Sequence, residues 1–187
     1  VPVETILNNL NLILIKLDSK CYGEMFFSQN LLWKGYKNYG KIWAEAIITD
    51  AIKDKWDSNK LVNLLLSFPS ERWLWNLVET ADQVVQREFW QKAPVHHHEM
   101  ILEDIQYAIR RLLNVRRNFS ALCLASHAKS KLPITDVALV LEITATTECS
   151  EQVDTMISYY AEKLLERVQS SQEIELKEKM KLEWMYI

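Results

Sequence analysis

The sequence predicts an all-α protein made of successive antiparallel helical hairpins stacked as in an α-solenoid, with a compact multi-helix bundle as the alternative. Three observations predict this class. Only three glycines and four prolines occur in 187 residues, which leaves little material for the tight turns of a β-rich fold. Apolar residues recur at steps of three and four, the spacing of one helix face. The segments with this spacing are joined by short connections, which favour antiparallel pairs.

Residues 1–56 predict three helices. The apolar face of the first is made of Val3, Ile6, Leu7, Leu10, Leu14 and Leu17. The second covers residues 24–36 and closes near Gly40, and the third covers residues 42–56. The inner side of the third is expected to hold Trp43, Ile47, Ala51 and Ile52.

Residues 57–187 predict the helical hairpins, beginning with a short helix. Asp57 or Ser58 can accept a hydrogen bond from the unpaired amides of its first turn, and the helix must end before Pro69. The next stretch, SFPSERWLWNLVETADQVVQREFWQKAP, predicts two helices that face each other, with Ser70 as the N-cap of the first. Their packed residues are expected to be Trp73, Trp75 and Leu77, then Val84, Val85, Phe89 and Trp90, up to Pro94.

Two further hairpins are predicted after Pro94. The first joins its helices through the short connection 114–117, and its apolar stripes are Ile101, Ile105, Ala108, Ile109 and Leu112, then Phe119, Leu122, Cys123 and Ala125. The second begins near Pro133, which suits a first helical turn, and its partner helix is expected behind Ser150 as the capping residue. A final helix from about Gln172 is expected to pack Leu176, Met180 and Trp184.

The chain ends on four large residues, Trp184, Met185, Tyr186 and Ile187. Chain ends are usually polar, because terminal residues have few neighbours to offset the entropy lost on ordering. In a solenoid each hairpin packs between two others, so a hairpin at a cut end exposes an apolar stripe. We therefore interpret these residues as an inter-repeat or self-association surface, which would support a homo-oligomer. We also interpret residues 1–187 as one helical-repeat domain, a fragment of a longer chain.

Three stretches of the sequence resemble, in this order, the helical-repeat regions of large multidomain bacterial proteins: SFPSERWLWNLVETADQVVQREFWQKAP, YAIRRLLNVRRNFSALCLASH and LEWMYI. The matching residues are Phe68, Pro69, Trp73 or Trp75, Phe89, Trp90, Arg110 to Leu113, Leu182, Glu183, Trp184 and Tyr186. Some such regions look like the sensor or scaffold arms of STAND-type NTPases and other defence-related proteins. The resemblance implies a sensor or scaffold role, and its motifs transfer no catalytic residue.

Charge is unevenly distributed along the second half of the chain. Residues 105–131 contain six basic residues and no acid: Arg110, Arg111, Arg116, Arg117, Lys129 and Lys131. Residues 132–187 contain eleven acids against five bases. Complementary exposed surfaces and solvated turn charges are the ordinary interpretation. The basic residues are also candidate partner-binding residues, for an acidic peptide, another domain or, in a nucleic-acid-binding helical domain, a phosphate backbone.

One cluster of candidate metal ligands is present, His96, His97 and His98 with Glu99 and Glu103. Adjacent histidines point in different directions on a helix, HExxH is absent, and acids are favoured in a first helical turn, so a solvated helix start is preferred over a metal-dependent enzyme. Ser120 and Ser126 lie near His127 in sequence but lack an acid or a glycine-rich elbow. The three cysteines share no CxxC spacing, and no phosphate-binding glycine motif occurs. We expect no cofactor and no active site.

The apolar runs are much shorter than the roughly 20 residues of a membrane span, and Val1 to Leu17 lacks the features of a signal peptide. These observations predict a cytoplasmic protein without a membrane partner. Taken with the helical hairpins, they predict a non-catalytic protein-interaction or sensor module of a larger bacterial protein.

Overall fold

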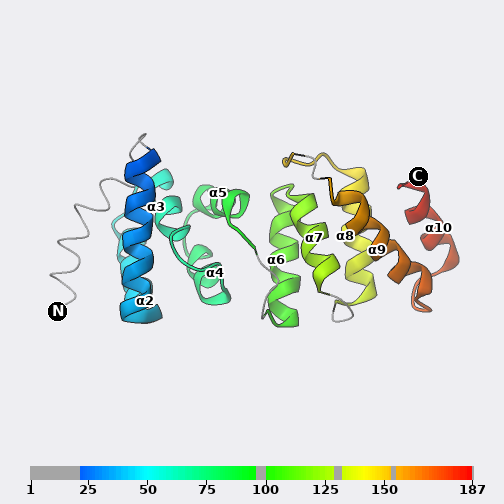
Figure 1. Ribbon diagram of the computed structural model, residues 1–187, viewed down its shortest axis with the longest axis horizontal. Helices are drawn as coiled ribbons and strands as arrows, with labels where there is room; N and C mark the ends of the chain where they lie inside the picture. Colours follow the sequence, from blue (N-terminus) through cyan, green and yellow to red (C-terminus); the bar gives the residue numbers. More distant parts are fainter. Residues whose placement is uncertain (1–21, 96–99, 129–131, 153–154, 187) are drawn as a thin grey trace. The chain divides into compact units, whose positions relative to one another are not determined.

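The computed structural model describes residues 22–95, 100–128, 132–152 and 155–186, and within these ranges α-helices are the only regular secondary structure (Figure 1). The predicted all-α class is confirmed. Contacts divide the chain into two compact units, Val1–Pro94 and Val95–Ile187. None of the described helices combines the length and hydropathy needed to cross a bilayer. The stacking of the hairpins as a solenoid stays a prediction.

The first unit begins with α2 (Tyr22–Lys53), which bends at Gly40. Gly40 has φ 78° and ψ −172°, a conformation that is essentially restricted to glycine, so the element consists of two helical stretches, as the sequence predicted. The third element, α3 (Ser58–Leu65), begins behind Asp57, whose carboxylate accepts hydrogen bonds from the amides of Asn59 and Lys60 at 2.9 and 3.4 Å. This N-cap was predicted correctly.

The unit is completed by α4 (Arg72–Val78) and α5 (Gln83–Lys92). The prediction that Ser70 caps α4 is wrong, because the Ser70 hydroxyl instead accepts a hydrogen bond from Trp75 Nε1 at 3.0 Å. Trp75 is completely buried, and its ring contacts that of Trp90 at 5.4 Å between centroids. Val84, predicted on the packed stripe of α5, is 56% exposed.

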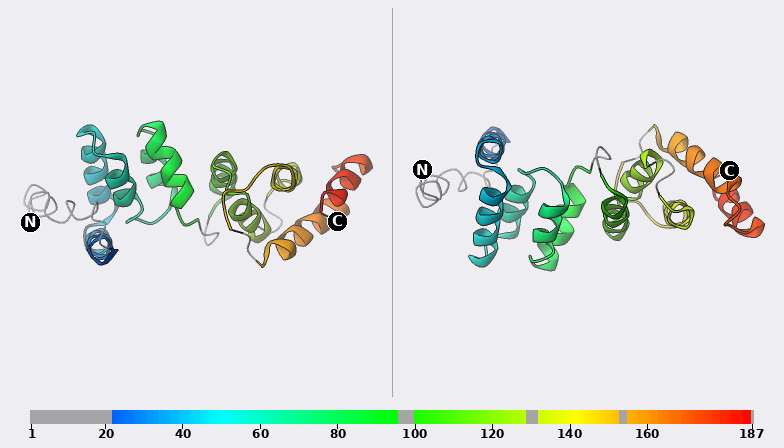
Figure 2. Two further views of the ribbon diagram at one scale, coloured as in Figure 1. Left: turned by 90° about the horizontal axis from the view of Figure 1, so that it is seen from above. Right: turned by 90° about the horizontal axis from the view of Figure 1, so that it is seen from below.

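The second unit contains five described helices, which are α6 (Leu102–Asn114), α7 (Asn118–His127), α8 (Ile134–Thr146), α9 (Ile157–Ser170) and α10 (Leu176–Trp184). The first two form the predicted hairpin and lie side by side in both views of Figure 2. Helix α7 also contacts α8 and α9, and α10 contacts α8 and α9. Ala121 and Ala125 of α7 are fully buried, and their small side chains allow close approach of the surrounding helices.

Two predictions about this unit are wrong. Ser150 does not cap α9, which begins seven residues later, because the Ser150 amide and hydroxyl both donate to the Arg116 carbonyl, at 2.8 and 3.0 Å. On α10, the predicted packed residues Leu176, Met180 and Trp184 are 72%, 50% and 75% exposed. The helix buries Leu182 instead, so the sequence indicated the wrong face.

Candidate functional site

The arginines of the predicted basic surface occupy different environments. Arg110 is exposed on α6, and the Arg111 guanidinium lies over the Tyr107 ring at 5.3 Å from its centroid. Arg116 follows the helix with a φ of 61°, and its guanidinium lies 3.6 Å from the Glu148 carboxylate in an exposed ion pair. Lys129 and Lys131 lie outside the described residues.

Arg117 is mostly buried, which corrects the expectation of a solvated turn charge. Its side chain is 15% exposed, and its Nε donates a hydrogen bond to Glu151 Oε1 at 3.0 Å. A second guanidinium nitrogen donates to the Ser120 hydroxyl at 2.9 Å, and the Ser120 amide donates to Glu151 Oε2 at 3.0 Å. The Ser120 hydroxyl also donates to Glu151. These three residues, the Arg117 cluster, join the start of α7 to the segment before α9.

Electrostatics keep the Glu151 carboxylate ionised. Burial alone raises its pKa. This effect is more than offset by hydrogen bonds from the Ser120 hydroxyl and amide, and by the hydrogen bond and positive charge of Arg117. The net result is a pKa below the ordinary glutamate value. A carboxylate with a lowered pKa is a weak base, so it is poorly suited to activate the Ser120 hydroxyl as a nucleophile. The cluster is therefore interpreted as a structural clamp, in which Arg117 of the basic segment pairs with Glu151 of the acidic segment.

A small pocket of about 230 Å³ borders the Arg117 cluster. It is lined by Val95, Phe119, Ser120, Cys123, Leu124, Glu151, Gln152, Ile157 and Tyr160. His127, at the end of α7, places Nδ1 2.8 Å from the Cys123 carbonyl oxygen, and its ring contacts that of Tyr160. His127 thus lies in the last turn of α7, and its Nδ1 is also 3.3 Å from the Ser126 hydroxyl oxygen.

The predicted histidine cluster, His96 to His98 with Glu99, lies outside the described residues. Glu103 is exposed in the first turn of α6, where its charge is favourable to the helix dipole. In the part of the chain that the structure describes, no three His, Cys, Asp or Glu side chains gather as a metal site.

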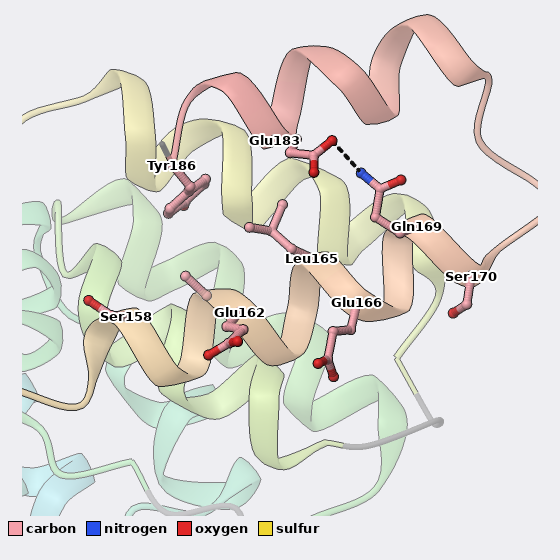
Figure 3. Close-up of a pocket in the computed structure, with 9 residues that line it drawn as sticks. Ser158, Glu162, Leu165, Glu166, Gln169, Ser170, Glu183 and Tyr186 are labelled. Atoms are coloured by element: carbon pink, nitrogen blue, oxygen red, sulfur yellow. Dashed lines mark hydrogen bonds between the residues drawn. The ribbon is translucent and has the colours of Figure 1, made fainter.

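A larger pocket of about 640 Å³ lies between α9 and α10 (Figure 3). We call it the α9–α10 groove; its lining consists of Ser158, Ala161, Glu162, Leu165, Glu166, Gln169, Ser170, Glu183 and Tyr186. Its apolar part comes from Ala161, Leu165 and the Tyr186 ring, and its charged part is entirely acidic. This groove was not among the sites predicted from the sequence. A sequence signal for it is the spacing of Glu162 and Glu166, four residues apart beside an apolar stripe.

The described residues at the chain end, Trp184, Met185 and Tyr186, occupy different environments. Trp184 is 75% exposed, Met185 is half-buried, and Ile187 lies outside the described residues. Tyr186 turns back onto α8, where its hydroxyl donates to the Leu141 carbonyl oxygen at 2.8 Å. Burial raises the pKa of the Tyr186 hydroxyl to about 12, although a hydrogen bond with Thr144 opposes the shift.

Contacts with α9 fix the position of α10 beside the groove. Lys179 Nζ donates to the carbonyl oxygens of Gln169, at 2.9 Å, and Ser171, and Gln169 Nε2 lies 3.5 Å from Glu183. The two walls of the groove are therefore tied together at the end where α9 stops.

Comparison with known proteins adds no family: no family model, no curated protein and no solved structure matches the chain. The assignment of function therefore depends on the residues and geometry described above.

Proposed function

We propose that this chain is a non-catalytic protein-interaction module, a scaffold or sensor arm in which helical hairpins present side chains to a protein partner. The observation that carries the proposal is the exposed apolar row on α10, made of Leu176, Met180 and Trp184. These residues are spaced by four, so they lie on one helix face. A contiguous exposed apolar face with a tryptophan is typical of an interaction site, since such residues contribute most to binding free energy.

The alternatives receive less support from the same residues. A nucleic-acid-binding domain would use the basic segment, but Arg116 and Arg117 already contact Glu148 and Glu151, which reduces the positive charge offered to phosphates. The polar groups of the Arg117 cluster bond to one another, between the start of α7 and the segment before α9. An enzymatic role for this cluster would need a base able to activate the Ser120 hydroxyl, and the lowered pKa of Glu151 makes its carboxylate a weak base.

A pair of matched double variants tests the proposal. Met180→Ser with Trp184→Ser removes the row, and Ile42→Ser with Val84→Ser removes two exposed apolar residues of the first unit as a control. Both changes lie at exposed positions, so we expect the free energy of unfolding to change by no more than about 0.5 kcal/mol. Each variant is used to capture proteins from cells that produce this chain. The molar mass of each purified variant in solution is measured by light scattering.

We expect recovery of a defined partner to fall at least about tenfold for the α10 variant, the loss of a typical hot spot, and to stay unchanged for the control. The interaction is then reproduced with the purified partner. A drop from dimer to monomer mass would identify a second copy of this chain as the partner. Equal recovery and equal mass for both variants would show that the row contacts no protein, which contradicts the proposal.

A further inference from the structure

The α9–α10 groove has the length of a helix-binding surface. Its α9 wall runs from Ser158 to Ser170, and at a rise of about 1.5 Å per residue the distance between these two residues along the helix is about 18 Å, or about three turns. A second helix, α10, forms the other wall (Figure 3). A third helix laid between two helices can pack its side chains into the space between them, as helices pack throughout globular proteins.

The bottom of the groove is apolar and incompletely covered. Ala161 is buried and small, while Leu165 and the Tyr186 ring are half-buried. Water in contact with these side chains is released when an apolar side chain from a partner covers them, which favours binding. Residues spaced by three or four on a partner helix would follow the groove in the mode used by many amphipathic recognition helices.

The rim of the groove is negatively charged. Glu162, Glu166 and Glu183 are exposed, and no Lys or Arg is among the lining residues. Two basic residues of α9 stand next to these acids in sequence. Lys163 points its ammonium at the Tyr159 ring, 4.8 Å from the centroid, and Arg167 donates a hydrogen bond to the Leu132 carbonyl oxygen at 2.8 Å. Glu162 and Glu166 are four residues apart on one helix and repel each other, so a cation between them is stabilising.

We propose that the α9–α10 groove binds a basic amphipathic helix of a protein partner, with its apolar row in the groove and its flanking Lys or Arg side chains opposite Glu162, Glu166 and Glu183. This inference rests on the proposed function, because it names the partner chemistry for a surface beside the α10 row. An acidic helix would bring like charges together, and an uncharged helix would gain only the apolar contact.

Three labelled 14-residue peptides test the inference on the full chain. They share one row of leucines at helical spacing and differ only in the flanking residues, which are Lys, Gln or Glu. Binding is measured by fluorescence anisotropy at low salt and at physiological salt. The groove variant is Glu162→Gln with Glu166→Gln, and the control, with the same change in net charge, is Glu103→Gln with Glu178→Gln, two exposed acids outside the groove lining.

We expect the Lys peptide to bind most tightly, the Gln peptide less and the Glu peptide least. The groove variant should weaken the Lys peptide by about three- to tenfold, as expected for two exposed charge pairs, and the control by less than about twofold. Salt should reduce this difference, because exposed charges are screened. Circular dichroism should show equal helix content in all three proteins.

Three results would overturn the inference. The Gln or Glu peptide could bind as tightly as the Lys peptide, the two variants could lose affinity equally, or no peptide could bind. Each leaves the capture experiment with Met180 and Trp184 unaffected, so failure of the partner chemistry is distinguishable from failure of the proposed function.

Discussion

Removal of the Glu151 carboxylate should loosen the second unit more than removal of any exposed acid. Glu151→Ala removes the hydrogen-bond contacts from Arg117 Nε, the Ser120 amide, the Ser120 hydroxyl and, at 3.7 Å, the Cys149 thiol, and it removes the carboxylate that faces the mostly buried Arg117 guanidinium. The two side chains of the ion pair are only 15% and 20% exposed. Breaking a fully buried pair costs about 3–5 kcal/mol, so for this mostly buried pair we expect a loss of about 2–4 kcal/mol.

Glu148→Ala is the matched control, three residues away in sequence. Its ion pair with Arg116 has side-chain exposures of 92% and 68%, and exposed pairs contribute little. We expect a change within about 0.5 kcal/mol. Urea unfolding followed by circular dichroism measures both values, and hydrogen exchange should become faster in residues 116–128 for Glu151→Ala alone. Equal stability of the two variants would refute the assignment of the Arg117 cluster as a clamp.

The pH dependence of this contribution follows from the lowered pKa of Glu151. A group whose folded-state pKa is lowered stabilises the fold above its unfolded pKa, here 4.5, and loses this effect as pH falls through the folded value. The stability difference between the wild type and Glu151→Gln should therefore be constant from neutral pH to about pH 5 and shrink in more acidic solution. A difference that grows as the pH falls would have the wrong sign.

Two further predictions concern the glycines and the chain end. Gly40→Ala should lower the free energy of unfolding by about 1–3 kcal/mol because of the backbone conformation alone, since no atom lies near the added carbon. Gly35→Ala should lower it by about 1–3 kcal/mol because the added carbon meets the buried Trp43 ring. Thermal unfolding measures both, and wild-type melting of either variant would contradict its stated cause. Tyr186→Phe should lower the free energy of unfolding by about 1 kcal/mol, because the hydrogen bond to the Leu141 carbonyl oxygen is lost. The substitution should also remove a phenol that titrates near pH 12 in ultraviolet absorbance. A titration near pH 12 that is unchanged by the substitution would contradict the burial of the Tyr186 hydroxyl.

Local capping could be predicted from the sequence only where the side chain had no competing hydrogen-bond partner. Asp57 lies directly before an apolar helix and caps it, as expected. Ser70 and Ser150 have the same local signal, but Trp75 and the Arg116 carbonyl take their hydrogen bonds. The partner of Ser150 is 34 residues away, which a local pattern does not contain, whereas Ser70 bonds a side chain of the same helix that it was expected to cap.

The buried face of a helix could likewise be predicted from the sequence for some helices and not for others. On α6 the predicted stripe is correct for Ile105, Ala108, Ile109 and Leu112. It is wrong for Ile101, which precedes the helix and is 60% exposed. On α10 two apolar directions compete, and the buried one, with Leu182, is set by contact with α8 and α9. The α9–α10 groove was missed for this reason, because it forms only when both helices are placed.

Hydrogen exchange of the full chain, with and without a saturating concentration of the Lys peptide, shows whether a partner helix docks between α9 and α10. We expect slower exchange in residues 158–170 and 183–186, the segments that contribute the groove, with no change in α2 to α5. Protection confined to other helices, or no protection at a peptide concentration that saturates the anisotropy signal, would contradict docking of a partner between α9 and α10.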